Sequence, residues 1–203
     1  MSTPDQTDAV AATAAVRRRL LEEAARLLGE EGPSSLTTRR LAREVGTSTM
    51  AVYTHFGGMP ALVSEVAAEG FRRLIARVDE VEPTDDPLAD LQRMAVAYRA
   101  NALDNRYLYA VMFGSASRGG YQLEAAAVEV GAAAFAQLRD AVARAMSAGA
   151  LRAGDPSAVA GQFWSALHGY VMLELAGYHQ ITDDPENDVL WPMLAHLLSD
   201  LRA

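Results

Sequence analysis

Residues 45–56, VGTSTMAVYTHF, gather hydroxyl, methyl and imidazole groups in one short stretch. Thr47, Ser48 and Thr49 come first, and Tyr53 and His55 lie near its end. Small hydroxyl and methyl groups suit base edges in a DNA groove, and a tyrosine hydroxyl or a histidine N–H suits a phosphate. The sequence contains no cysteine and no G-x-S-x-G, H-E-x-x-H or phosphate-loop motif. The stretch therefore predicts a DNA-binding surface rather than a catalytic site.

Two short helices are needed to position these groups. Residues 37–45 fit a helix capped by Thr37, and residues 48–56 fit a second helix capped by Ser48. Gly46 lies between them, where the turn needs positive φ. This arrangement is typical of a helix-turn-helix, whose second helix enters the major groove. A helical hairpin with no contact to DNA is the alternative.

Apolar residues define the buried faces of these helices. Leu41, Ala42 and Val45 are expected to pack on the preceding helix, and Val52 and Phe56 share one face because they lie four positions apart. The outward side chains of the second helix and the turn before it are then Thr47, Ser48, Thr49, Met50, Tyr53 and Thr54.

Composition limits the class of protein. Half of the 203 residues are hydrophobic, which is ample for a buried core. The first sixteen residues lack the features of a signal peptide, and no run of about 18 apolar residues occurs, so we expect a cytoplasmic protein without a membrane partner. The net charge is −8, yet residues 10–56 hold seven Arg against five Glu, a charge of +2. Residues 76–203 hold nine Arg against 17 acids, so a basic segment precedes an acidic body.

Helical periodicity runs through the whole chain, and strand patterns are absent. The fold class predicted is all-α with about nine helices, preceded by a frayed tail over residues 1–10. The expected helices are residues 11–31, 37–45, 48–56, 59–80, 87–104, 106–113, 121–148, 155–180 and 185–202. The expected domains are a three-helix DNA-binding domain, 11–58, and a helical effector-binding and dimerisation domain, 59–203.

Residues 35–67, SLTTRRLAREVGTSTMAVYTHFGGMPALVSEVA, resemble the DNA-binding segment of the TetR family of bacterial repressors. The resemblance implies that Arg39 pairs with a guanine, that residues 49–51 read bases, and that Tyr53 and His55 grip phosphates. The DNA-binding residues expected from pattern and resemblance together are Thr38, Arg39, Thr47, Ser48, Thr49, Met50, Ala51, Tyr53, Thr54 and His55.

The sequence departs from the family pattern at two positions. Met59 stands where the family usually has a lysine that binds phosphate, and Ala51 offers a base only a methyl group. We therefore expect modest affinity with an ordinary salt dependence. The three arginines at 17–19 either add phosphate contacts or form a solvated face.

Residues 98–114 and 163–175 resemble one subgroup of TetR-family C-terminal domains, named for the W-x-x-x-H-G pattern formed here by Trp164, His168 and Gly169. The resemblance implies an effector pocket, and the aromatic and methionine side chains suit a small, mainly apolar ligand. The pocket residues expected are Met94, Tyr98, Tyr109, Met112, Phe113, Phe135, Trp164 and His168. Ordinary core packing is the alternative for each of them.

The resemblance also implies a homodimer formed by a four-helix bundle of the last two helices. The interface residues expected are Phe163, Leu167, Tyr170, Leu194, Leu197 and Leu198. Together these features predict a TetR-like regulator, a repressor that leaves a palindromic operator when a small ligand binds. We expect double-stranded DNA, a second copy and an effector as partners, and neither cofactor nor metal.

Two acidic stretches, 84–90 (TDDPLAD) and 182–188 (TDDPEND), support a different class. Asp-rich pairs in an all-helical chain are similar to the magnesium sites of enzymes that act on diphosphates. The alternative is a helix start, with Asp as N-cap and Pro at the first helical position. A DNA-binding protein without an effector is the third hypothesis.

Overall fold

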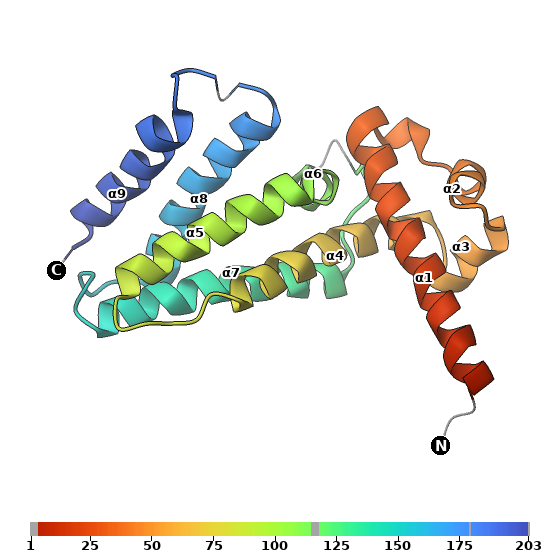
Figure 1. Cartoon of the computed structure of the whole chain (residues 1–203), viewed down its shortest axis with the longest axis horizontal. Helices are drawn as coiled ribbons and strands as arrows, with labels where there is room; N and C mark the ends of the chain where they lie inside the picture. Colours follow the sequence, from red (N-terminus) through yellow and green to blue (C-terminus); the bar gives the residue numbers. More distant parts are fainter. Residues whose placement is uncertain (1–3, 115–117, 179, 203) are drawn as a thin grey trace. The chain divides into compact units, whose positions relative to one another are not determined.

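The computed structural model describes residues 4–114, 118–178 and 180–202. This part of the chain folds into nine α-helices and no strand, so the all-α prediction is confirmed (Figure 1). The helices are α1 Pro4–Arg26, α2 Thr38–Val45, α3 Thr49–Phe56, α4 Met59–Asp79, α5 Pro87–Asp104, α6 Arg106–Phe113, α7 Ala125–Ser147, α8 Pro156–Leu175 and α9 Trp191–Asp200. The chain also contains three short helical turns. Two are π-helical, at Leu27–Glu31 and Glu186–Leu190, and one is 3₁₀, at Pro33–Ser35.

Helix α1 is longer than the sequence predicted. It begins at Pro4, so the prediction of a frayed tail is wrong for residues 4–10. Proline is tolerated in the first turn of a helix, where its missing N–H would have no partner. Alanines at 9, 11, 12, 14 and 15 then favour helix over loop.

The chain forms two compact units, and each is described by itself. The first unit comprises residues up to Phe71 together with Asn105–Val130, and the second comprises Arg72–Asp104 together with residues from Gly131 onward. In the first unit the core joins α1, α2, α3, the start of α4 and α6. Its fully buried side chains include Leu20, Leu27, Leu41, Val52, Leu62, Val63, Val66 and Val111.

The π-helical turn after α1 brings α6 unusually close. A Cβ on Gly29 would lie 2.8 Å from Cδ1 and 3.3 Å from Cα of Tyr107. The Tyr107 hydroxyl also donates a hydrogen bond to the neighbouring Glu30 carboxylate. The absent side chain at Gly29 therefore lets α6 dock on this turn within the first unit.

Helix α8 supplies much of the core of the second unit. Phe163, Leu167 and Val171 are buried, as are Leu91 of α5 and Leu194 of α9. Asp155 begins α8 by accepting a hydrogen bond from the Ser157 amide at 2.9 Å, with Pro156 at the first helical position. This confirms the predicted start of α8.

Candidate nucleic-acid interface and effector cluster

The helix starts and the turn of the helix-turn-helix are those predicted from the sequence. The Thr37 hydroxyl accepts a hydrogen bond from the Arg40 amide, and the Ser48 hydroxyl accepts one from the Ala51 amide, both at 3.2 Å. Gly46 has φ +69°, a left-handed conformation that favours glycine. These contacts fix where α2 ends and α3 begins.

Helix α3 divides into a buried and an exposed face. Val52 is fully buried and Phe56 nearly so. Met50 and Tyr53 expose 68% and 53% of their surface. Thr49 and Thr54 are also exposed, while Ala51 and His55 are half-buried. The exposed face of α3 therefore presents hydroxyl, methyl, thioether and phenol groups to solvent.

The three arginines of α2 differ in their partners. Arg40 makes hydrogen bonds of 2.8 and 2.7 Å to the Glu31 carboxylate, which raises its pKa. Arg43 pairs with Glu44 at 3.1 Å. Arg39 is exposed, and no partner for its guanidinium is recorded among the described residues. Arg39 is thus the guanidinium of α2 that is available to a ligand.

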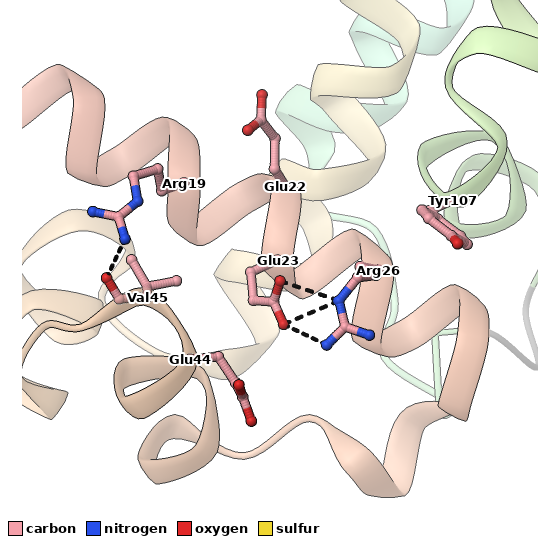
Figure 2. Close-up of a pocket in the computed structure, with 7 residues that line it drawn as sticks. All are labelled: Arg19, Glu22, Glu23, Arg26, Glu44, Val45 and Tyr107. Atoms are coloured by element: carbon pink, nitrogen blue, oxygen red, sulfur yellow. Dashed lines mark hydrogen bonds and ion pairs between the residues drawn. The ribbon is translucent and has the colours of Figure 1, made fainter.

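Arginines of α1 hold the helix-turn-helix in place. Arg17 pairs with Glu65 of α4 and stacks over the Phe56 ring, 5.2 Å from its centroid. Arg19 donates a hydrogen bond of 2.6 Å to the carbonyl oxygen of Val45, at the end of α2 (Figure 2). Arg17 and Arg19 therefore make contacts within the first unit.

A cavity of about 350 Å³ lies beside the contact between Arg19 and Val45 in the first unit. Figure 2 shows Glu23 hydrogen-bonded to Arg26, three residues further along α1. Glu23 raises the pKa of that guanidinium, with Glu30 adding to the effect. The cavity is lined by Arg19, Glu22, Glu23, Arg26, Glu44, Val45 and Tyr107. Three carboxylates against two guanidiniums make this surface unsuited to a phosphate, in contrast to the exposed face of α3.

Four of the predicted pocket residues meet in the second unit. The Trp164 indole N–H donates to the Tyr98 hydroxyl at 3.2 Å, and that hydroxyl lies 3.1 Å from Nδ1 of His168. Phe135 packs edge-on to Trp164, with ring centroids 6.1 Å apart. An indole only donates, so the Tyr98 oxygen accepts the hydrogen bond from Trp164. Burial lowers the pKa of His168, which favours the neutral ring.

The other predicted pocket residues lie elsewhere. Met94 lines a cavity of about 310 Å³ in the second unit, together with Asp90, Gln137 and Arg144. Tyr109, Met112 and Phe113 belong to the first unit. Phe113 packs there against Tyr109 at 4.9 Å and against Phe71 at 5.6 Å between ring centroids. The spacing of the aromatic residues along the sequence did not reveal that the predicted pocket residues belong to two different units.

The residues expected at a dimer interface lie mainly in the core of the second unit. Phe163, Leu167 and Tyr170 expose 2%, 3% and 7% of their surface, and Leu194 is also buried. They have almost no surface left for a partner, because α8 turns this face toward its own unit. Leu197 and Leu198 are half-buried. The exposed face of α8 is a different one, formed by Ser165, Gly169, Met172 and Leu173.

The two acidic stretches form helix starts. Oδ1 of Asp86 accepts hydrogen bonds from the Leu88 and Ala89 amides at 3.1 and 3.0 Å, and Oδ1 of Asp184 accepts one from the Asn187 amide at 3.3 Å. Bonds from a backbone amide to an Asp side chain are typical of a helix start, which was one of the two interpretations of these stretches. Within the described ranges, no cluster of three or more histidine and acidic side chains is arranged to hold a metal ion.

Asp90, the last residue of the first acidic stretch, is a buried acid. Its carboxylate is 1% exposed and accepts hydrogen bonds from the Thr84 amide and hydroxyl and from Arg144 at 2.7 Å. Burial alone would raise its pKa, but the Thr84 bonds and the charges of Arg93 and Arg144 outweigh burial and lower it. Asp90 therefore ties the start of α5 to α7 as an anion.

None of the described helices is both long enough and apolar enough to cross a membrane.

Comparisons with known proteins agree with this architecture. Residues 20–66 match the family described as bacterial regulatory proteins, tetR family, and residues 91–197 match the family described as tetracyclin repressor-like, C-terminal domain. The chain is 31% identical over 178 residues to the uncharacterized HTH-type transcriptional regulator Rv0681 of Mycobacterium tuberculosis, a match that covers 86% of this chain and 76% of that protein.

Solved structures show the same likeness. A protein of unknown function from Rhodococcus sp. RHA1 is 30% identical with a TM-score of 0.75, and the match covers 93% of this chain and 96% of that one. The TetR-family transcriptional regulator PfmR from Thermus thermophilus has a TM-score of 0.69 over 89% of this chain and 97% of its own. At 21% identity, PfmR shows similarity of fold alone.

A helix-turn-helix with an exposed recognition surface, carried by an all-helical chain, defines a class of DNA-binding regulators. The family matches extend over both the helix-turn-helix and the following helices. The chain belongs to the TetR family and is a DNA-binding transcriptional regulator of that family.

Proposed function

We propose that the chain is a homodimeric repressor that binds a palindromic operator through α2 and α3 and leaves it when a small, mainly apolar ligand binds. Residues 11–58 act as the DNA-binding domain and residues 59–203 as the effector-binding and dimerisation domain. The observation that carries the proposal is the exposed face of α3, with Met50 and Tyr53 more than half exposed. These side chains are exposed enough to reach base edges and phosphates in a DNA groove.

Each exposed group has a role in the proposed complex. The Arg39 guanidinium binds a guanine edge, and Thr49, Met50 and Ala51 contact bases. The Tyr53 hydroxyl and the His55 ring bind phosphates, which fix the register without reading sequence. Thr38, Thr47, Ser48 and Thr54 complete the surface. The charge of +2 over residues 10–56 favours this end of the acidic chain for DNA.

The cluster of Tyr98, Phe135, Trp164 and His168 is the proposed effector site. Two aromatic rings supply apolar surface, and the Tyr98 hydroxyl and the His168 ring supply polar groups. The effector binds more tightly to a conformation that does not fit the operator than to the one that does. The ratio of these two affinities limits how far it can shift the equilibrium between the two conformations. Helix α4 begins in the first unit and ends in the second, so it is the proposed route of coupling.

The proposed dimer uses the exposed face of α8 with Met193 and Leu197, two half-buried side chains of α9. Two copies then present their α3 helices at a spacing of about 34–36 Å, one turn of DNA. We assign the C-terminal domain to the W-x-x-x-H-G subgroup of TetR-like domains. This assignment does not identify the ligand. A bacterial protein that binds operator DNA acts in the cytoplasm, which is the proposed location. The acidic stretches are proposed to serve only as helix starts, in a protein without enzymatic activity.

Genome-fragment selection with purified protein at a stated salt concentration tests the proposal. Recovery of one palindromic site, protected as two half-sites, is the expected result. A matched selection with Arg39→Ala protein should recover that site far less efficiently. Recovery of random fragments by both proteins, with no shared site, would contradict sequence-specific binding by α3.

A further inference from the structure

A groove separates α5 from α9 in the second unit. Both helices pack on α8, and between them lies a cavity of about 330 Å³. It is lined by Asp86, Leu88, Ala89, Gln92, Phe163, Trp191, Leu194, Ala195, Leu198 and Arg202. It contains none of Tyr98, Phe135, Trp164 or His168, so it is distinct from the proposed effector site.

The floor and walls of the groove are apolar. Phe163 and Leu194 are buried and form the floor. Leu88, Trp191 and Leu198 are half-buried, so each keeps surface that faces the cavity. The Trp191 indole is fixed in orientation by a hydrogen bond of 3.1 Å from its N–H to the Glu186 carboxylate. A ligand in this groove gains most of its affinity from an apolar body.

The two charged side chains of the groove differ in availability. Asp86 accepts two backbone hydrogen bonds at the start of α5, and the positive end of that helix further offsets its charge. Arg202 is exposed, and no partner of its guanidinium is recorded in the described part of the chain. Among the residues that the structure describes, Arg202 thus gives the groove a guanidinium with no recorded partner, beside apolar walls.

The backbone places Arg202 at this groove. The segment after α9 pairs with the segment after α7 through an antiparallel bridge between Arg202 and buried Leu151. The Arg152 amide donates to the Leu201 carbonyl oxygen at 2.9 Å, and the Arg152 guanidinium donates to the Asp200 carbonyl oxygen. These bonds fix the backbone that leads into Arg202, whose side chain lines the groove.

We infer that this groove binds a small carboxylic acid with an apolar chain or ring. The carboxylate pairs with Arg202 and the apolar body lies between Leu88, Trp191 and Leu198. The cavity holds the volume of about eleven water molecules at roughly 30 Å³ each, which suits a ligand of about ten non-hydrogen atoms. Octanoate has this size and charge.

Isothermal titration calorimetry of the full chain with octanoate, octylamine and 1-octanol at fixed ionic strength tests the inference. Octanoate should bind more tightly than the amine or the alcohol. Arg202→Gln should weaken octanoate binding about three- to tenfold and leave the alcohol unchanged. Ala195→Leu, which fills the groove, should weaken binding of octanoate by about tenfold or more.

Two matched variants control for charge and volume elsewhere in the second unit. Arg139→Gln removes an exposed guanidinium of α7, and Ala133→Leu adds an exposed leucine to the same helix. Both should bind octanoate like the unaltered chain. Equal affinity for octanoate and octylamine, or absence of octanoate binding, would overturn the inference. So would loss of octanoate binding in Tyr98→Phe with retention in Arg202→Gln, because the acid would then occupy the effector cluster.

Discussion

Arginines 17, 19, 39 and 43 belong to one small unit and differ in what they contact. Arg17 and Arg19 bind groups within the unit, Arg43 pairs with the adjacent Glu44, and Arg39 has no recorded partner among the described residues. Only a guanidinium without an internal partner can bind DNA without first breaking a contact. The difference between a stabilising and a ligand-binding arginine thus follows from its neighbours in space, which spacing along the sequence does not reveal.

Replacing Arg39 by alanine should lower operator affinity about ten- to hundredfold and relax the preference at one base position, because a bidentate contact to guanine contributes roughly 1–3 kcal/mol. Fluorescence anisotropy with the operator and with single-base variants measures both effects. Arg43→Ala, on the same helix, should change affinity much less and alter no base preference. An unchanged base preference in the Arg39 variant would remove this residue from base recognition.

Replacing Tyr53 by phenylalanine should weaken binding to every sequence by about the same factor, because a phosphate contact carries no sequence information. The expected loss is about 0.5–1.5 kcal/mol, the usual net contribution of one hydrogen bond. Thermal unfolding should not change, since the Tyr53 side chain is more than half exposed. A loss confined to one operator sequence would show that the phenol contacts a base.

Replacing Asp90 by asparagine should lower the free energy of unfolding by about 2–4 kcal/mol, because Arg93 and Arg144 would lose their buried anion. Because the pKa of Asp90 is lower in the folded chain, this carboxylate is protonated in the unfolded chain first as the pH falls. Its stabilisation is therefore complete above the unfolded pKa of about 3.9 and is lost as pH falls through the folded pKa. Urea unfolding at several pH values should show a smaller loss on acidification in the variant. Asp140→Asn, at an exposed position, should stay within about 0.5 kcal/mol.

At the scale of elements, local chemistry made the helix-turn-helix predictable. The caps at Thr37 and Ser48, the left-handed Gly46 and the start of α8 at Asp155 and Pro156 all depend on residues within a few positions of one another. The π-helical turn at Leu27–Glu31 was not predictable in the same way. It accommodates Tyr107, which follows some eighty residues later, so no local pattern marks it.

Replacing Gly29 by alanine should destabilise the protein by about 1–3 kcal/mol, because the new Cβ would overlap the Tyr107 ring and its backbone. Gly161→Ala provides the opposite test in α8. No heavy atom lies within 4 Å of a Cβ at that position, so alanine should stabilise by about 0.5–1 kcal/mol through helix propensity alone. Chemical unfolding of both variants measures the contrast. Equal effects at the two glycines would show that α6 does not dock tightly on the π-helical turn.

At the scale of the whole molecule, fold class was predictable and the grouping of segments was not. Helical periodicity is repeated along the chain, so nine helices were expected and nine are seen in the described part. Which helix faces meet depends on contacts between distant segments. The predicted pocket therefore combined Trp164 of the second unit with Tyr109 of the first, and the predicted dimer face of α8 is a face that its own unit buries.

Replacing Leu173 by glutamate should weaken the proposed dimer by about tenfold or more, because a charge would be buried where a 54% exposed leucine meets its partner. Sedimentation over a range of concentrations should show more monomer, and operator affinity should fall because two half-sites no longer bind together. Leu103→Glu, at an exposed leucine of α5, should leave the association unchanged. An unaltered dimer in the Leu173 variant would exclude this face of α8.

Both tryptophans of the chain, Trp164 and Trp191, lie in the second unit, whereas the recognition helix lies in the first. Selectively excited tryptophan emission therefore observes only one half of the protein. Its unfolding curve follows the second unit, and tyrosine emission or circular dichroism is needed for the first. A change in tryptophan emission when operator DNA is added would consequently be an optical signal of rearrangement in the unit that does not carry α3.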